Sequence, residues 1–148
     1  MPVERLILVA VIIVVAVVVA GIVQRRRPDA PTQSRNAVIP QQLDRDDFEG
    51  SDVDWLVVVF SSDTCDACEE VLVKARSLES DDTAVQDVSW QREKSLHERY
   101  AINTVPTMVI AGRDGAVGAG FVGIPPTNEL WAAMASMRDA GAEAPGTE

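Results

Sequence analysis

The sequence predicts an α/β domain, built as a mixed β-sheet flanked by helices and preceded by one N-terminal transmembrane helix. Three observations lead to this fold class. Residues 6–23 form an unbroken apolar run, residues 55–100 alternate segments of strand and helix pattern, and residues 107–122 form a glycine-bounded hairpin pattern. The chain has 148 residues, a length that favours one folded domain.

Charge and composition exclude several classes of protein. Residues 1–35 carry five basic and two acidic side chains, whereas residues 36–148 carry eight basic and twenty-one acidic ones. A domain this acidic repels phosphate backbones, so we expect no nucleic-acid partner. Two cysteines exclude a disulfide-rich scaffold, and with one histidine the chain lacks four soft ligands for a zinc site. We expect no metal or other cofactor.

The N-terminal run supplies much of the hydrophobic composition. Leu6 to Val23 are eighteen consecutive residues without a polar side chain, and a helix of that length spans roughly 27 Å. A cleaved signal peptide is the alternative, since Val18-Val19-Ala20 resembles a cleavage site. However, the run is longer than signal peptides use, and three arginines follow it instead of preceding it. We therefore expect an uncleaved anchor at residues 1–24.

Polar and proline-rich residues separate the anchor from the predicted domain. Residues 25–40 lack apolar periodicity and contain Pro28 and Pro31, so they are expected to form a semi-extended, basic linker. The folded domain is expected at residues 41–140. Residues 141–148 offer no core-forming side chain and are expected to be a flexible tail.

The elements of the domain follow from local pattern. Residues 44–48 indicate a short capped helical segment, and the acidic run of residues 44–54 is typical of a solvated face. Trp55 to Phe60 is a continuous apolar run, as expected for a strand buried on both faces. The remaining elements are a helix at 65–78, a strand at 83–88, a helix at 93–100, a hairpin of strands at 107–111 and 116–122, and a helix at 128–139.

The candidate chemistry lies at the first strand-to-helix junction, in Cys65-Asp66-Ala67-Cys68. A sulfur at a helix N-terminus faces free amide groups and the helix dipole, which favour the thiolate of Cys65. Cys68 lies one turn further in, where it can attack a mixed disulfide on Cys65. Two unrelated core cysteines, or half of a zinc site completed by another chain, would show the same spacing.

A second motif favours thiol exchange over these alternatives. Val105-Pro106-Thr107 precedes the hairpin, and together with the buried strand, the cysteine pair, the glycine turn and the last helix it resembles the thioredoxin superfamily over residues 41–140. The resemblance implies a thioredoxin-like fold, a cis Pro106 beside the cysteines, and a Val105 backbone that pairs with the substrate chain. It also implies protein disulfides and dithiols as partners.

The sequence departs from that family near the cysteines. Thr64 replaces the usual tryptophan before the first cysteine, and Val59 replaces a buried aspartate that helps to move protons. Asp66-Ala67 replaces Gly-Pro, and Glu69 replaces a lysine. These changes indicate a divergent member, and Thr64 is the residue that would meet the substrate in place of tryptophan.

His97 and the tryptophans have plainer interpretations. His97 is followed by Glu98 on a short helix, so we expect it at the surface; the alternative is a metal ligand beside Cys65 and Cys68. Trp55, Trp90 and Trp131 are expected to pack in or around the core, with Trp90 as a candidate neighbour of the site.

The sequence therefore predicts a membrane-anchored thiol–disulfide oxidoreductase that works in the reducing direction, with Cys65 attacking and Cys68 resolving. The alternative is a tethered docking module without catalysis. Because arginines crowd the C-terminal side of the apolar run, the positive-inside rule places the domain in the cytoplasm. The substrate, the electron donor and the oligomeric state are not encoded in any pattern that we recognise.

Overall fold

The computed structural model describes residues 11–19 and 37–143. Residues 11–19 are helical and every one of their side chains is exposed. Among the described residues, no helix is both long and apolar enough to cross a membrane. The rest of the predicted span, the proposed cleavage site near Ala20, most of the linker and the last five residues lie outside the described ranges.

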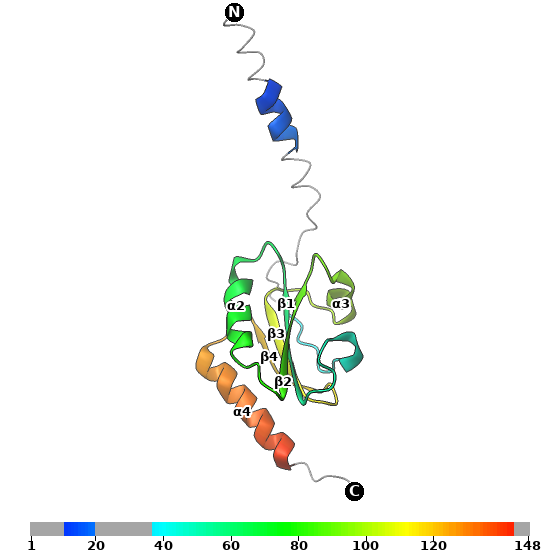
Figure 1. Cartoon of the computed structure of the whole chain (residues 1–148), viewed down its shortest axis with the longest axis vertical. Helices are drawn as coiled ribbons and strands as arrows, with labels where there is room; N and C mark the ends of the chain where they lie inside the picture. The colour runs from blue at the N-terminus through cyan, green and yellow to red at the C-terminus, as the bar shows by residue number, and fades with distance from the viewer. Residues whose placement is uncertain (1–10, 20–36, 144–148) are drawn as a thin grey trace, which may run out of the picture.

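The domain is a four-stranded mixed sheet in the order β2-β1-β3-β4, with helices on both faces (Figure 1). The chain order is η1 (Arg45–Asp47), β1 (Trp55–Ser61), α2 (Asp66–Arg76), β2 (Thr83–Ser89), α3 (Lys94–Arg99), β3 (Thr107–Ala111), β4 (Val117–Val122) and α4 (Thr127–Glu143). β1 pairs in parallel with β2 and antiparallel with β3, and β4 pairs antiparallel with β3. The predicted mixed sheet is confirmed.

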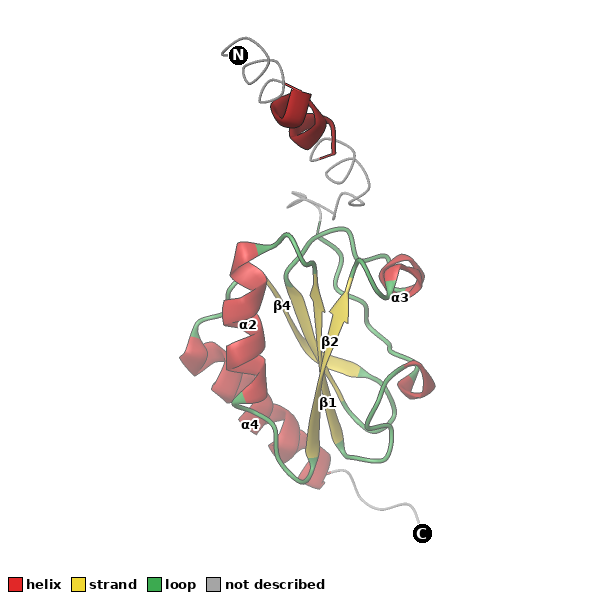
Figure 2. Cartoon of the chain, turned by 45° about the horizontal axis from the view of Figure 1, so that its top comes forward, coloured by secondary structure: helices red, strands yellow, loops and turns green. Residues whose placement is uncertain are grey.

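β1 forms the centre of the fold because its apolar side chains point alternately to two cores. Val57 and Val59 pack with residues of α2 and α4, whereas Leu56, Val58 and Phe60 pack in a second cluster that contains Phe48 and Tyr100. Figure 2 shows α2 and α4 on one face of the sheet and η1 and α3 on the other. A run buried on both faces explains why β1 has no polar alternation.

The last helix is longer than the sequence pattern predicted. α4 continues to Glu143, past the expected end at Asp139. At Gly141 the backbone of α4 passes so close to the Trp55 ring that an added Cβ would lie 3.2 Å from it. The Trp55 ring thus lies alongside a helical turn that has few apolar side chains of its own.

The acidic run is not a uniformly solvated face. Arg45, the second residue of the run, is buried and donates hydrogen bonds to the carbonyl oxygens of Gly112, Gly50 and Val53 at 2.7, 2.8 and 2.8 Å. The Tyr100 hydroxyl donates to Asp47, and burial together with this bond raises the pKa of Tyr100 to about 12. The acidic side chains of the run are mostly exposed, as expected, but the expectation of solvation was wrong for Arg45, whose acceptors include the distant Gly112 carbonyl.

Candidate active site

The two cysteines form a disulfide at the start of α2. Cys65 is the N-cap of α2, Cys68 lies in its first turn, and their Cα atoms are 5.4 Å apart. Cys65 is half-buried, while Cys68 is only 3% exposed. A partner can therefore reach the sulfur of Cys65 more easily than that of Cys68, which suits an attacking and a resolving thiol.

The surroundings of the disulfide are acidic. Asp66 and Glu69 lie exposed in the first turn of α2, and neither takes part in an ion pair among the described residues. Glu70 pairs with Lys74 at 3.1 Å, one turn further along the helix. The favourable field of the helix N-terminus is therefore opposed by carboxylates, without a cation in the first turn.

Pro106 and Val105 lie at the same end of the sheet as the disulfide. The Val105–Pro106 peptide bond is cis, as the family resemblance implies. Thr107, which follows, pairs with Phe60 near the end of β1, and β1 leads directly into the loop before Cys65. The backbone N–H of Gly123 donates to the Pro106 carbonyl oxygen at 2.8 Å. Val105 is buried, with 8% exposure.

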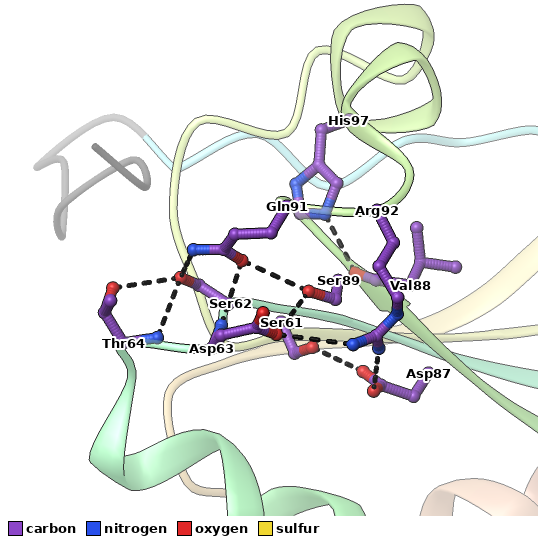
Figure 3. A network of polar contacts seen from close by, with 10 residues as sticks. All are labelled: Ser61, Ser62, Asp63, Thr64, Asp87, Val88, Ser89, Gln91, Arg92 and His97. Atoms are coloured by element: carbon purple, nitrogen blue, oxygen red, sulfur yellow. Dashed lines mark hydrogen bonds and ion pairs between the residues drawn. The ribbon is translucent and has the colours of Figure 1, made fainter. Parts of the chain in front are cut away.

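Thr64 projects from the loop between β1 and α2. Its side chain is exposed, and its hydroxyl lies 3.1 Å from the Ser62 hydroxyl, within hydrogen-bond distance (Figure 3). Thr64 stands immediately before Cys65, the more accessible of the two cysteines. The structure thus brings all the predicted site residues to one end of the sheet.

A polar network next to the cysteines was not expected from the sequence. Gln91 holds the β1–α2 loop, since its Oε1 accepts from the Asp63 backbone at 2.9 Å and its Nε2 donates to Ser62 at 3.0 Å (Figure 3). Arg92 pairs with Asp63 at 3.4 Å and with Asp87 at 3.0 Å. These bonds join the loop before Cys65 to the loop after β2. The sequence offers only a weak indication of this network, because single polar residues in loops form no periodic pattern.

The position of the missing aspartate has a polar neighbour. Val59 is fully buried, and Asp87 of β2 is its parallel partner. The Ser61 hydroxyl donates to the Asp87 carboxylate, which also meets Arg92. A carboxylate is therefore present one strand away from the position where the family has one.

His97 is buried and not at the surface, contrary to expectation. Its Nε2–H donates to the Val88 carbonyl oxygen at 2.9 Å, and its ring lies between Phe60 and Trp90, 5.2 Å from each centroid. The bond to the Val88 carbonyl makes a histidine acceptable in the core. Burial lowers the pKa of His97. Among the described residues, no three metal-ligating side chains gather, and the Trp90 ring contacts the ring of His97.

A cleft of about 850 Å³ lies at the other end of the sheet. Trp55, Met137, Arg113, Arg138 and Gly112 line it together with smaller residues. Arg113 and Arg138 each face a carboxylate, of Asp54 and Asp82 respectively. Because Trp55 begins β1 and the cysteines follow its end, this cleft is separate from the disulfide.

Comparison with known proteins shows the fold. No family model and no curated protein matches the sequence. A mutant thioredoxin from Halobacterium salinarum is 28% identical, with a TM-score of 0.52 over 58% of this chain and 76% of that one. The germline-specific thioredoxin Deadhead of Drosophila melanogaster is 26% identical, with a TM-score of 0.51 over 60% and 85%. Thioredoxin F of spinach chloroplast is 20% identical, with a TM-score of 0.50 over 69% and 99%.

The geometry and the comparisons agree on a coarse assignment. The neighbours from Halobacterium and Drosophila are thioredoxins, the sheet is thioredoxin-like, and the disulfide occupies the N-terminus of the helix that follows β1. This chain therefore contains a thioredoxin-like domain, and its Cys65–Cys68 pair supports a general thiol–disulfide oxidoreductase activity.

Proposed function

We propose that this chain is a membrane-anchored thiol–disulfide oxidoreductase that reduces disulfides of protein partners. The observation that carries the proposal is the unequal exposure of two bonded sulfurs at a helix N-terminus, with Cys65 half-buried and Cys68 buried. Thiol exchange needs one accessible nucleophile and one protected nucleophile within reach of it.

The reaction proceeds in two balanced steps from the reduced domain. The Cys65 thiolate attacks one sulfur of a partner disulfide, so the partner's S–S bond breaks and its other sulfur leaves as a thiolate. Cys68, deprotonated, then attacks the Cys65 sulfur, which releases the second partner thiolate and forms the Cys65–Cys68 disulfide. The partner gains two electrons and takes up two protons, and the domain is oxidised.

The residues around the cysteines would hold the partner during these steps. The backbone of Val105 would pair with the partner chain, beside the cis Pro106 and the exposed Thr64. Gln91 and Arg92 hold the loop before Cys65 through Asp63, which limits the movement of the nucleophile. A rigid site lowers the entropic cost of aligning two sulfurs.

The proposed anchor comprises residues 6–23. The described part of it, residues 11–19, is helical with large apolar side chains that are 53% to 66% exposed. Such side chains gain free energy in a hydrocarbon environment, where a helix also satisfies its own backbone. The arginines at positions 25–27 favour a cytoplasmic domain by the positive-inside rule.

Trapping of partners tests the exchange activity. In cells, Cys68→Ser should accumulate proteins covalently bound through Cys65, because the mixed disulfide can no longer be resolved, while Cys65→Ser should trap none. Non-reducing gels compare the two variants. An absence of adducts with Cys68→Ser, or equal adducts with both variants, would favour the alternative of a non-catalytic docking module, for which Val59 and Thr64 argue.

A reporter fusion tests the orientation independently. A reporter that is active only outside the cytoplasm, fused after Glu148, should be silent, and a reporter that is active inside should give signal. The opposite result would place the domain on the outer side.

A further inference from the structure

Four exposed apolar side chains flank the disulfide end of the sheet. Val38, Ile39, Val122 and Ile124, here called the apolar ridge, are 44%, 38%, 42% and 44% exposed. In the described domain only two other large apolar side chains, Val73 and Trp131, are as exposed. Exposed apolar side chains near a functional end are what an interaction surface requires.

The segment before η1 builds half of the ridge. Its backbone runs antiparallel to β4. The Leu43 N–H donates to the carbonyl oxygen of Gly115 at 2.8 Å, and the Val117 N–H donates to that of Gln41 at 3.0 Å. Ile39 then lies over Gly120, where an added Cβ would approach it to 2.4 Å. Going back from Leu43 to Ile39, the segment therefore follows β4 toward Val122.

This direction brings the chain into the domain at the end that holds the disulfide. β4 ends at Val122 beside Thr107, and the next residue, Gly123, bonds to the Pro106 carbonyl oxygen. The described domain begins at the end where α2 also begins (Figures 1 and 2). The sequence between the proposed span and Ala37 is thirteen residues long and can reach at most about 45 Å.

Four acidic residues close to the disulfide in the chain, Asp63, Asp66, Glu69 and Glu70, are here called the acidic rim, and Lys74 joins the rim to the ridge, since it pairs with Glu70 and donates to the carbonyl oxygen of Pro125, next to Ile124. All four side chains are exposed, and their described cationic partners are Arg92 for Asp63 and Lys74 for Glu70. Within the part of the chain that the structure describes, no cation pairs with the other two carboxylates, those of Asp66 and Glu69. The rim attracts a basic chain and repels an acidic one.

We propose that the substrate is a basic, cysteine-bearing segment next to the membrane span of another protein, bound between the apolar ridge and the acidic rim. This proposal rests on the proposed function and adds the substrate class. Segments beside spans are rich in lysine and arginine on the cytoplasmic side, and they adjoin apolar residues. Their positive charge complements the rim, and their apolar residues fit the ridge.

Reduction of two disulfide peptides by the full chain in detergent tests the charge preference. Each peptide contains two cysteines joined by a disulfide, one leucine and four charged residues. The charged residues are lysines in one peptide and glutamates in the other. The full chain is reduced beforehand, freed of reductant, and mixed with each peptide in a single turnover. At low salt the lysine peptide should be reduced at least ten-fold faster, and 0.5 M salt should shrink this ratio because it screens the rim.

Charge reversal locates the preference on the rim. In the double variant Asp66→Lys and Glu69→Lys, the ratio of the two rates should fall to one or below. The ratio is the readout because both peptides meet the same thiolate, so a changed pKa of Cys65 cancels. The matched control, Glu79→Lys with Asp139→Lys, makes the same charge change at exposed positions away from the rim and should keep the ratio.

Distance from the bilayer is tested in vesicles that hold the full chain. The lysine peptide is joined to a synthetic span by five or by forty residues, and the shorter spacing should be reduced faster. Equal rates for the two soluble peptides, or faster reduction at the longer spacing, would overturn the substrate class but leave the oxidoreductase intact. If neither peptide is reduced and Cys68→Ser traps no protein, both proposals fall.

Discussion

Val59 of β1 lies directly opposite Asp87 of β2, so an apolar side chain is paired with a carboxylate across the two parallel strands. The carboxylate is satisfied by Ser61 and Arg92, whereas Val59 is fully buried against the helical layer of α2 and α4. The chain therefore keeps this carboxylate on the edge strand β2 and leaves the centre of the core, at β1, apolar.

Val59→Asp should destabilise the domain because it places a carboxyl group in that core without a partner. We expect the free energy of unfolding to fall by about 3 kcal/mol at neutral pH. Burial and the neighbouring Asp87 would raise the pKa of the new group, so the folded state would hold its proton to a higher pH than the unfolded state. The loss should therefore be larger at pH 8 than at pH 5.

Urea unfolding at the two pH values measures this effect. Val59→Asn is the matched control, since it is polar but does not titrate, and its loss should not change with pH relative to the wild type. If Val59→Asp and Val59→Asn show the same pH response, the new carboxyl group is solvated and the core is not dry.

The elements were predictable where a single local pattern decides the structure. β1 is a wholly apolar run, and the β3–β4 hairpin has glycine at both ends of its turn, including Gly115 with φ of +78°. The cysteine pair was visible for the same reason, because its spacing is local. By contrast, the burial of Arg45 depends on three carbonyl groups supplied by loops up to 67 residues away.

The same limit explains the errors about His97 and the network of Gln91. A histidine followed by a glutamate on a helix suggests solvent, and only the fold reveals the Val88 carbonyl oxygen and the two aromatic rings around it. Tertiary hydrogen bonds of this kind leave no periodic trace in the sequence. The cysteine pair could therefore be found in the sequence, but the hydrogen bonds that hold the neighbouring loops could not.

Arg45→Ala should reduce stability more than its place in an acidic segment suggests. The variant leaves the carbonyl oxygens of Gly50, Val53 and Gly112 without their donor, at a cost of about 2–4 kcal/mol. Chemical denaturation measures the loss. The comparison is Arg113→Ala, which removes an exposed ion pair with Asp54 and should cost less than about 1 kcal/mol. Similar losses for the two variants would contradict the structural role of Arg45.

His97 should make stability depend on pH in mildly acidic solution. Because burial lowers the pKa of His97 in the folded state, the unfolded chain binds a proton first as the pH falls. Stability is therefore fully present above the ordinary histidine pKa of about 6.5 and declines below it, until the folded protein also becomes protonated. Denaturation curves at pH 7.5 and 5.5 should show the decline in the wild type.

His97→Gln is the informative variant, since glutamine retains an N–H donor for the Val88 carbonyl oxygen but does not titrate. It should be less stable than the wild type at pH 7.5, because it loses the ring contacts, and the difference should narrow at pH 5.5. An unchanged pH response in this variant would assign the acid sensitivity to other groups.

The charge around the cysteines should set a reducing potential. Asp66 and Glu69 oppose the helix N-terminus, so the Cys65 thiolate gains less stabilisation than in a strongly oxidising member of the superfamily. A less stable thiolate makes the reduced form less favoured and the disulfide harder to reduce. Equilibration with glutathione buffers should give a value near the roughly −270 mV of thioredoxin, and a value above about −200 mV would contradict this reasoning.

Asp66→His should shift the potential in the positive direction, because it removes a negative charge beside Cys65 and adds a group that becomes positive near neutral pH. A fall of about one unit in the pKa of Cys65 corresponds to roughly 1.4 kcal/mol, or about 30 mV for a two-electron couple. Glu79→His, beyond the C-terminal end of α2, makes the same change of charge far from the sulfur and should leave the potential within a few millivolts. Since the two variants alter the net charge equally, a positive shift confined to Asp66→His would assign the poise to the first turn of α2. Equal shifts, or none, would show that the helix backbone sets the poise without help from its acidic side chains.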